Sequence, residues 1–369
     1  MEKCIRVLQM IGSLNMGGSQ SMIMNIYRGI DRKKVQFDFI IDKSDELFFF
    51  DEIEKLGGNI YILPSFNGLN QKEIKESWEL FFKTHLEYKI LHSHVRSYAS
   101  LYLPIARKYG IKTIIHSHST SSGSGIKSLV KQVMQLPLRY QADYLFSCSE
   151  ESGRWLFGKS ALSKKNYKMI PNAIDCSKYK YNLKIRKMIR NQYGLKDNEL
   201  LFGHVGRFSK PKNHNFLIDI FAEFSKNHDA KLMLIGDGEL RINIEQRIEK
   251  LGIQDNVMIL GTRTDVNKLM QAMDVFLFPS LWEGLPVTII EAQASGLPCF
   301  VSNRVTKDVN VSSLIYNISL NQNAADWCKI IENTNLERQN VIEDIKKAGF
   351  DIEGLANWME DFYRGLIDE

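Results

Sequence analysis

The chain alternates short, almost continuously apolar segments with longer helical stretches. The apolar segments of the first half are CIRVLQMI, VQFDFIID, NIYILP, YKILHSH, KTIIHSH and ADYLFSCS, and those of the second half are ELLFGHVGR, AKLMLIGDG, NVMILG, VFLFPS and PCFVS. Strands that lack inside–outside alternation are buried on both faces, as in a parallel sheet covered by helices. The sequence therefore predicts an α/β fold of two doubly wound, Rossmann-like domains that face each other across a cleft.

The expected domain boundaries follow from this pattern. A charged stretch, Tyr181–Asn198, separates the two strand series and is expected to be a polar linker. The predicted domains are residues 1–180 and 196–350, with ligands expected at the carboxyl ends of the strands. A terminal helical stretch, Gly354–Ile367, has one apolar face that is expected to be buried. The residues of this face are Leu355, Trp358, Phe362 and Leu366.

Composition narrows the class of protein. An apolar content of 44% with 25% charged residues is typical of a soluble globular chain. No apolar segment approaches the roughly 20 residues that a membrane-spanning helix needs. Arg6 interrupts the short apolar run near the N-terminus, so a secretory signal is not expected. The five cysteines are dispersed without metal or redox spacing, which favours reduced thiols and a cytoplasmic location.

Positive charge is concentrated in one quarter of the chain. Residues 96–190 contain 18 Lys and Arg against 4 Asp and Glu, a net charge of +14 in a chain whose total is +5. Such a region is either an ordinary solvated face or, because apolar residues are interleaved with the charges, a surface for anionic lipid headgroups. Nucleic acid is not expected as a partner, because no RNA- or DNA-binding motif accompanies the charges. The interleaved residues are Leu129, Val130, Val133, Met134, Leu136 and Tyr140.

The run FPSLWEGLPVTIIEAQASGLPCF, residues 278–300, has the pattern of a strand end, a turn and a helix. Pro286 suits the first helical turn, where no backbone N–H is needed, and the helix N-terminus offers amides to a diphosphate. Glu291 lies about 6–8 Å further along the helix, at a suitable distance for ribose hydroxyls. Glu283 precedes the helix, where a sugar on the far phosphate would lie. The run predicts a nucleotide-sugar site.

Further residues at strand ends fit the same ligand. Arg207 and Lys212 flank a turn after a strand, and together they can neutralise a diphosphate without a metal. Gly236 lies in a strand-end turn, and Gly261 with Thr262 follows another strand and is expected to border the nucleobase.

A glycine turn, GSLNMGGSQ, follows the first predicted strand. Gly18 stands where a P-loop needs Lys, and the spacing does not fit a dinucleotide fingerprint. Gly17 and Gly18 would still let backbone amides approach a ligand at a helix N-terminus. The alternative is a tight strand–helix turn with no ligand.

Two His-x-His pairs, His92/His94 and His116/His118, occur at strand ends. Residues i and i+2 of a strand share a face, so each pair resembles metal ligands. No acidic residue or Cys lies nearby at ligand spacing, and we expect these histidines to bind a substrate or one another, with no metal site. His118, which precedes Ser119 and Thr120, is the expected sugar contact.

In this order, Gly17-Gly18, His118, Arg207, Lys212 and Glu283-x7-Glu291 resemble the motifs of retaining glycosyltransferases of family 4, which have the GT-B fold. The resemblance covers nearly the whole chain, and PSLWEGLPVTIIEAQASGLPCFVSN carries most of it. The sequence of that block resembles the corresponding block in the family members that build bacterial exopolysaccharides and capsules.

The resemblance assigns the acceptor side to residues 1–180 and the sugar nucleotide to residues 196–350, and residues 351–369 would pack back on the first domain. The implied catalytic residues are His118, Arg207, Lys212 and Glu283. Where many relatives have Gly-Phe-Gly after the residue that matches Glu283, this chain has Gly-Leu-Pro. Pro286 has no backbone N–H to donate to a phosphate, so the phosphate is expected to bind at a shifted position. The implied donor-binding residues are Gly17, Gly18, Gly236, Gly261, Thr262, Gly284, Leu285, Val287, Thr288 and Glu291.

The resulting prediction is a hexosyltransferase that uses a nucleotide diphosphate sugar, expected to be UDP-linked, and a lipid-linked saccharide acceptor. Retention of configuration is expected through front-face displacement, in which the leaving diphosphate takes the acceptor proton. No metal cofactor is expected, and the enzyme would be cytoplasmic or peripheral on the inner membrane face. Two alternatives remain: a UDP-sugar 2-epimerase on the same fold, and a non-catalytic partner subunit that binds a sugar nucleotide.

Overall fold

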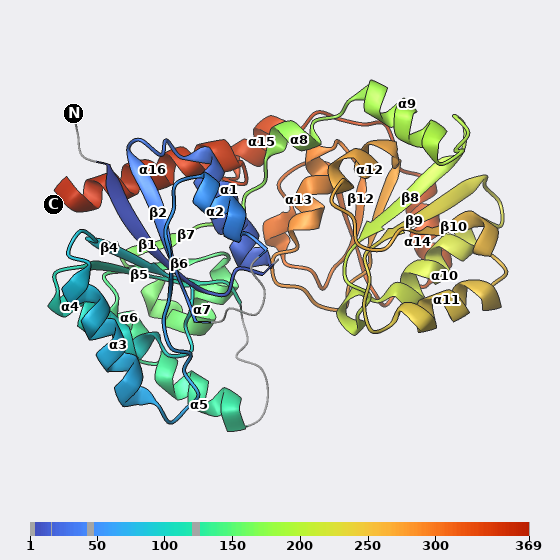
Figure 1. The fold of residues 1–369 in the computed structure, drawn as a ribbon. Helices are drawn as coiled ribbons and strands as arrows, with labels where there is room; N and C mark the ends of the chain where they lie inside the picture. The colour runs from blue at the N-terminus through green and yellow to red at the C-terminus, as the bar shows by residue number, and fades with distance from the viewer. Residues whose placement is uncertain (1–3, 16, 43–47, 120–125, 369) are drawn as a thin grey trace. The chain divides into compact units, whose positions relative to one another are not determined.

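The computed structural model describes residues 4–15, 17–42, 48–119 and 126–368 (Figure 1). The chain forms two compact units, one of residues 1–173 with 351–369 and the other of residues 174–350. We call them unit 1 and unit 2. Each contains a parallel sheet with helices on both faces, so the predicted pair of doubly wound α/β domains is confirmed.

Unit 1 is built on a seven-stranded sheet with the order β3-β2-β1-β4-β5-β6-β7, and every pair of neighbours is parallel. The strands are β1 Ile5–Gly12, β2 Val35–Ile41, β3 Ile60–Ile62, β4 Ile90–Ser93, β5 Lys112–Ser117, β6 Tyr144–Ser147 and β7 Tyr167–Met169. The helices are α1 Gly18–Gly29, α2 Phe50–Lys55, α3 Gln71–Thr84, α4 Ala99–Lys108, α5 Ile126–Gln135, α6 Leu138–Gln141, α7 Glu150–Phe157 and α16 Ile352–Asp368.

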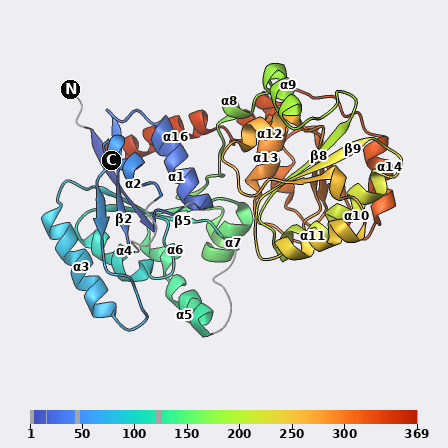
Figure 2. The same ribbon diagram turned by 45° about the vertical axis from the view of Figure 1, so that its right-hand side comes forward.

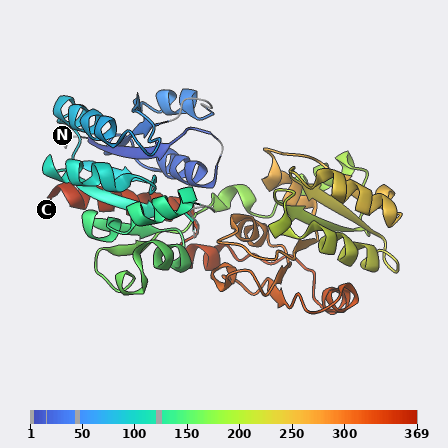
Figure 3. The ribbon, with the colours of Figure 1, turned by 90° about the horizontal axis from the view of Figure 1, so that it is seen from below.

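Two hydrophobic cores cover the two faces of this sheet. One packs α1, α2 and α16 against it, and the other packs α3, α4, α6 and α7 (Figure 1). Helix α16 returns to unit 1 although unit 2 precedes it in the chain (Figure 3). It lies so close to α1 that a Cβ atom at Gly29 would be 2.9 Å from that of Ala356. Tyr363 of α16 is fully buried, with its ring edge-on to Phe37.

Unit 2 has a six-stranded parallel sheet with the order β10-β9-β8-β11-β12-β13. Helices α10, α11 and α14 cover one face, and α9, α12, α13 and α15 cover the other (Figure 2). The strands are β8 Leu200–Val205, β9 Ala230–Ile235, β10 Val257–Ile259, β11 Val275–Phe278, β12 Cys299–Ser302 and β13 Ile315–Ile318. The helices are α8 Cys176–Tyr179, α9 Leu183–Gln192, α10 His214–Phe224, α11 Arg241–Lys250, α12 Val266–Ala272, α13 Val287–Ala294, α14 Ala324–Glu332 and α15 Ile342–Lys347.

The linker predicted at Tyr181–Asn198 is wrong, because most of this stretch is helix α9 of unit 2. Arg190 is buried and, with Arg186, binds the carboxylate of Asp274 at 3.1 and 2.6 Å. Arg190 also donates to the backbone oxygen of Ala272 at 3.0 Å. The basic region 96–190 is therefore divided between the two units, and part of its charge is neutralised inside unit 2.

Each sheet has one point where the strand order reverses. In unit 1 the chain first extends from β1 to β2 and β3, and then from β4 in the opposite direction. In unit 2 the corresponding strands are β8 and β11. Ligands of open α/β sheets bind at the carboxyl ends of the strands beside such a reversal. In the part of the chain that the structure describes, no helix is long and apolar enough to cross a membrane.

Candidate functional site

Four loops of unit 2 are in backbone contact at the carboxyl edge of its sheet. The loop after β9 contacts the loop after β10, since the N–H of Gly236 donates to the carbonyl of Gly261 at 2.9 Å. It also contacts the loop after β8, because a Cβ at Gly236 would lie 2.0 Å from the carbonyl oxygen of Gly206. Gly236 has a φ of +140°, so both space and backbone conformation require glycine there.

The loops after β8 and β11 are joined in the same way. The N–H of Leu281 donates to the carbonyl of Pro211 at 2.8 Å. Asn213, in the left-handed conformation with a φ of +55°, donates its side-chain N–H to the carbonyl of Pro279 at 3.0 Å. These contacts hold the predicted site residues of the two loops at the point where the strand order reverses.

Lys212 and Glu283 form an ion pair at this point, with 2.8 Å between Nζ and Oε1. The side chains are only 16% and 14% exposed, and Nζ of Lys212 also lies 4.7 Å from the ring centroid of Phe278. Sequence reasoning placed both residues at a ligand site and missed that they bind each other. The structure thus brings a cation of the loop after β8 and a carboxylate of the loop after β11 together.

Arg207 lies on the same loop as Lys212 but has a different environment. Its side chain is 74% exposed, and its guanidinium lies 3.2 Å from the carboxylate of Glu239 in the loop after β9. Each of the two cations thus has a carboxylate partner of its own, and their joint binding of one diphosphate stays a prediction.

Helix α13 begins at Val287, and Pro286 is its N-cap rather than a residue of its first turn. The amides of Val287 and Thr288 lie in the first turn, where an α-helix offers no backbone acceptors. The side chains of Leu285 and Val287 pack against the core of unit 2, so their backbone is the part that can face a ligand. Gly284 and Thr262 are exposed.

Glu291, on α13, accepts a hydrogen bond from the hydroxyl of Tyr179 at 2.7 Å. Burial raises the pKa of Glu291, because the charged form loses hydration, and the Tyr179 hydroxyl opposes this shift. Sequence reasoning missed Tyr179, which belongs to α8 and is brought to α13 only by the fold. The pair offers a hydroxyl and a carboxylate to a polyhydroxylated ligand.

In unit 1, the glycine turn forms the N-terminus of α1. Gly17 is the N-cap and Gly18 the first helical residue. A Cβ at Gly17 would lie 2.6 Å from Oε1 of Gln20, whereas one at Gly18 would meet no atom within 4 Å. Helix α1 thus presents its first amides in a turn with open space at Gly18.

The four histidines at the ends of β4 and β5 form a stack of rings. Ring centroids are 4.3 Å apart for His92 and His94 and 4.1 Å apart for His116 and His118. Nδ1 of His94 lies 2.7 Å from Nε2 of His118, so the prediction that these histidines bind one another is confirmed for this pair. Thr120, predicted beside His118, lies outside the described residues.

Burial keeps these rings neutral. It lowers the pKa of His92, His94 and His116 well below the usual range, and the positive charge that each would carry further disfavours protonation of the others. Burial and then the Arg96 cation lower the pKa of His118 to about 3. Ring nitrogens of His92, His94 and His116 lie within 4.8 Å of one another, so the predicted lack of a metal stays a prediction.

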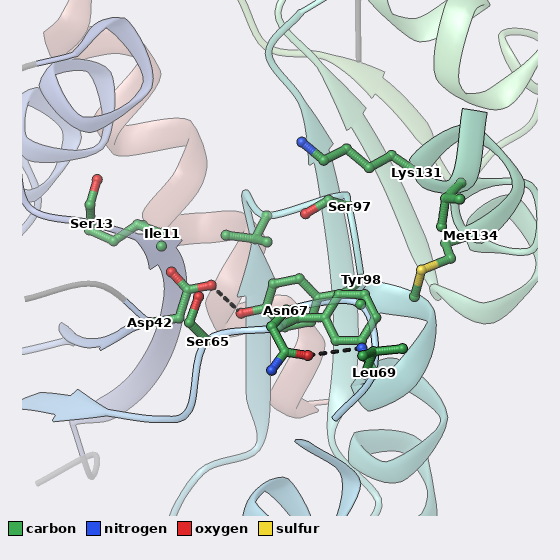
Figure 4. A pocket seen from close by; sticks show the side chains of 15 residues that line it. Ile11, Ser13, Asp42, Ser65, Asn67, Leu69, Ser97, Tyr98, Lys131 and Met134 are labelled. Carbon is green, nitrogen blue, oxygen red and sulfur yellow. Dashed lines mark hydrogen bonds between the residues drawn. The ribbon is translucent and has the colours of Figure 1, made fainter. Parts of the chain in front are cut away.

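A cavity of about 730 Å³ opens at the carboxyl edge of the sheet of unit 1 (Figure 4). The hydroxyl of Tyr98 donates to the carboxylate of Asp42 at 2.5 Å, and the ring of Phe66 lies 5.6 Å from that of Tyr98. Lys131 and Met134 contribute from α5. Sequence reasoning missed Phe66, Tyr98 and Asp42, although Asp42 is a polar residue at a strand end like the others, and it placed Met134 on the basic surface instead of in this cavity.

The sequence is similar to known glycosyltransferases. The sequence matches the family models described as Glycosyl transferases group 1, over residues 185–309, and Glycosyltransferase Family 4, over residues 16–178. EpsF of Bacillus subtilis (strain 168), named as a glycosyltransferase, is 32% identical over 358 residues, which are 94% of this chain and 93% of EpsF. An Escherichia coli protein named UDP-Gal:alpha-D-GlcNAc-diphosphoundecaprenol alpha-1,3-galactosyltransferase is 28% identical over 59% of this chain and 58% of its own.

Solved structures share the fold. HepE of Anabaena, crystallised with UDP and glucose, superposes with a TM-score of 0.76 at 19% identity, over 98% of this chain and 100% of HepE. The similarity to EpsF extends over nearly the full length of both chains, and the family models cover both units. The chain therefore belongs to the family 4 glycosyltransferases and has the GT-B fold.

Proposed function

We propose that this glycosyltransferase moves a hexose from a UDP-sugar to a lipid-linked saccharide in exopolysaccharide or capsule biosynthesis, with retention of configuration. The observation that carries the proposal is the enclosed pair Lys212–Glu283 beside the strand-order reversal of unit 2. A cation there suits a diphosphate, and a carboxylate suits the hydroxyls of the sugar attached to it.

The donor would occupy the carboxyl edge of unit 2. Lys212, the exposed Arg207 and the first amides of α13 would bind the diphosphate, with Glu283 and the backbone of Gly284 and Leu285 at the sugar. Glu291, oriented by Tyr179, would accept hydrogen bonds from the ribose. The turns at Gly236 and at Gly261–Thr262 would border the nucleobase.

The acceptor would occupy the cavity of unit 1. Its aromatic residues Phe66 and Tyr98 offer apolar faces to a sugar ring, and Asp42 and Lys131 offer polar contacts. Gly17 and Gly18 would approach the donor phosphates, and His118 a sugar hydroxyl. Two similar proteins support this choice of substrates. HepE was crystallised with UDP and glucose, and the name of the Escherichia coli relative contains UDP-Gal and a diphosphoundecaprenol saccharide.

Catalysis would rest on charge stabilisation. We propose front-face displacement, in which the bond from the anomeric carbon to the diphosphate breaks while the acceptor oxygen bonds to the same face. The leaving diphosphate takes the acceptor proton and carries the electron pair of the broken bond. Lys212, Arg207 and the helix amides stabilise its charge, so no resident metal is needed.

A surface of unit 1 would attach the enzyme to anionic lipid. Val133 and Leu136, at the end of α5 and just after it, are 59% and 56% exposed, and Val130 and Tyr140 are also exposed. Lys164 and Arg139 both lie over the ring of Tyr140, which adds positive charge to this apolar surface. Exposed apolar and cationic side chains together are typical of interfacial binding. Leu129, also predicted for this surface, has a side chain outside the described residues.

The test is turnover with defined substrates. Purified enzyme, in EDTA, is incubated with UDP-glucose, UDP-galactose and their N-acetylamino forms and with a polyprenyl-diphosphate monosaccharide in micelles. We expect a disaccharide product whose new anomeric proton has the coupling constant of the donor. Epimerisation of UDP-N-acetylglucosamine without acceptor would instead identify a 2-epimerase. Tight UDP binding without turnover of any pair would identify a non-catalytic subunit.

A further inference from the structure

A continuous chain of hydrogen bonds in unit 1 leads from helix α16 to His118. The side-chain N–H of Gln9, on β1, donates to the hydroxyl of Tyr363 at 3.3 Å. Oε1 of Gln9 lies 3.0 Å from Nε2 of His94, and Nδ1 of His94 lies 2.7 Å from Nε2 of His118. Gln9 is 1% exposed and Tyr363 is fully buried, so water does not compete for these bonds.

The direction of each bond follows from the first. Nε2 of the Gln9 amide can only donate, so the oxygen of the Tyr363 hydroxyl accepts from it, and the same hydroxyl lies 2.6 Å from Nδ1 of His92. The other end of that amide is then the carbonyl, which can only accept, and Nε2 of His94 must donate to it. A neutral His94 therefore has its lone pair on Nδ1, where it accepts from Nε2 of His118.

The same reasoning fixes the remaining ring nitrogen of His118. With its proton on Nε2, neutral His118 has its lone pair on Nδ1. This atom is buried and has no hydrogen-bond partner among the described residues. An unpaired buried polar atom costs free energy, so a partner is expected for it in the working enzyme.

We propose that Gln9 and Tyr363 are positioning residues that hold His118 in the Nε2–H tautomer, so that its Nδ1 accepts a hydrogen bond from a hydroxyl of the transferred sugar. The inference rests on the proposed function for the role of the sugar, and on the structure for the tautomer. Helix α16, which is far from His118 in the sequence, thereby becomes part of the hydrogen-bond chain that orients His118.

A metal bound by His92, His94 and His116 is the competing explanation for this cluster, because their ring nitrogens lie within 4.8 Å of one another. Both nitrogens of His94 already have hydrogen-bond partners, so metal binding would break either the bond to Gln9 or the bond to His118. The chain of bonds and the metal site are therefore mutually exclusive, and one experiment separates them.

The experiment measures the tautomer directly. Ring ¹⁵N shifts of His118 are recorded in enzyme labelled with ¹⁵N-histidine and assigned with His118→Gln. Wild-type enzyme should have a protonated Nε2 and an unprotonated Nδ1. Tyr363→Phe and Gln9→Leu should give a mixture of tautomers and lower kcat/KM for the UDP-hexose by about tenfold, the size of one lost hydrogen bond. Tyr27→Phe is the matched control, because Tyr27 also packs on Phe37 and loses a buried hydroxyl outside the chain of bonds.

Three other results would contradict the proposal or one part of it. A wild-type His118 protonated on Nδ1, or tautomers unchanged in Tyr363→Phe and Gln9→Leu, overturns the positioning role whatever the activity. A shifted tautomer with unchanged kcat/KM leaves the positioning intact and refutes the contact of His118 with the sugar. Stoichiometric Zn²⁺ binding that moves the signals of His92, His94 and His116 together overturns the proposal in favour of a metal site.

Discussion

Nζ of Lys212 lies 2.8 Å from Oε1 of Glu283, and this ion pair links the loops after β8 and β11. Both groups are largely removed from water, so each would be costly to leave without its partner. We propose that a diphosphate replaces the carboxylate as the partner of the ammonium group. Glu283 would then become available to sugar hydroxyls when the donor binds.

Replacing Lys212 with Ala should lower kcat/KM for the UDP-hexose by about 10²–10³-fold, the effect of removing one preorganised stabilising group from a transition state. Lys210→Ala is the control, since Lys210 is exposed in the same short 3-10 helix, Lys210–Lys212. Steady-state kinetics with both variants makes the comparison. Unchanged turnover in Lys212→Ala would refute the role of Lys212.

Glu291→Gln should stabilise the protein while weakening UDP binding. Burial raises the pKa of Glu291, so folding favours its protonated form and the charged form costs stability above the unfolded pKa of about 4. The gain in melting temperature should therefore be present at pH 7 and vanish as the pH falls below about 4. Thermal melts across this range, with and without UDP, test both the gain in stability and the loss of UDP binding. Glu249→Gln, at an exposed position of α11, should change neither.

Gly236→Ala and Gly261→Ala should differ in cost although both residues have positive φ. At Gly261, with a φ of +66°, an added Cβ meets no atom within 4 Å, so only backbone strain of about 1–2 kcal/mol is expected. At Gly236 the added Cβ would lie 2.0 Å from a backbone oxygen, and the loops after β8 and β9 must separate. Urea unfolding should show a clearly larger loss for Gly236→Ala, and equal losses would contradict the observed loop contact.

The double variant Val133→Ser, Leu136→Ser should weaken binding to anionic vesicles. Removing two exposed apolar side chains from an interfacial surface should cost about 2 kcal/mol or more, which is more than tenfold in partition coefficient. Leu80→Ser is the control, because Leu80 is 64% exposed on α3. Sedimentation with phosphatidylglycerol vesicles at low and high salt measures the effect. Equal binding of all three proteins would exclude this surface.

The architecture was largely predictable because each strand that is buried on both faces carries its own signal, a continuous run of apolar residues, in the local sequence. Strands covered on both faces need continuous apolar residues, and strand β2 is buried at every position. The linker was mispredicted because α9 is rich in Arg and Lys, whose partners are distant in the sequence. Arg190 meets Asp274 and the end of α12 only after the sheet has formed.

The site was predictable only as a set of strand ends. The carboxyl ends of parallel strands share an edge, so Arg207, Lys212 and Glu283 were placed on one side of a sheet without knowledge of the fold. Which side chains pair was not accessible, since Lys212–Glu283 and Tyr179–Glu291 depend on the packing of loops and helices. The start of α13 was misplaced for a similar reason, because Pro286 fits both an N-cap and a first turn.

The return of α16 to unit 1 has a consequence for how the protein is made. Unit 2 begins and ends side by side, with the N–H of Ile174 bonded to the carbonyl of Phe350 at 2.8 Å, so it can fold as an inserted domain while still on the ribosome. Unit 1 cannot complete its folding until later, because Tyr363 and Ala356 of its core are synthesised only after unit 2. During that interval the apolar face that α16 later covers is open to chaperones and to aggregation.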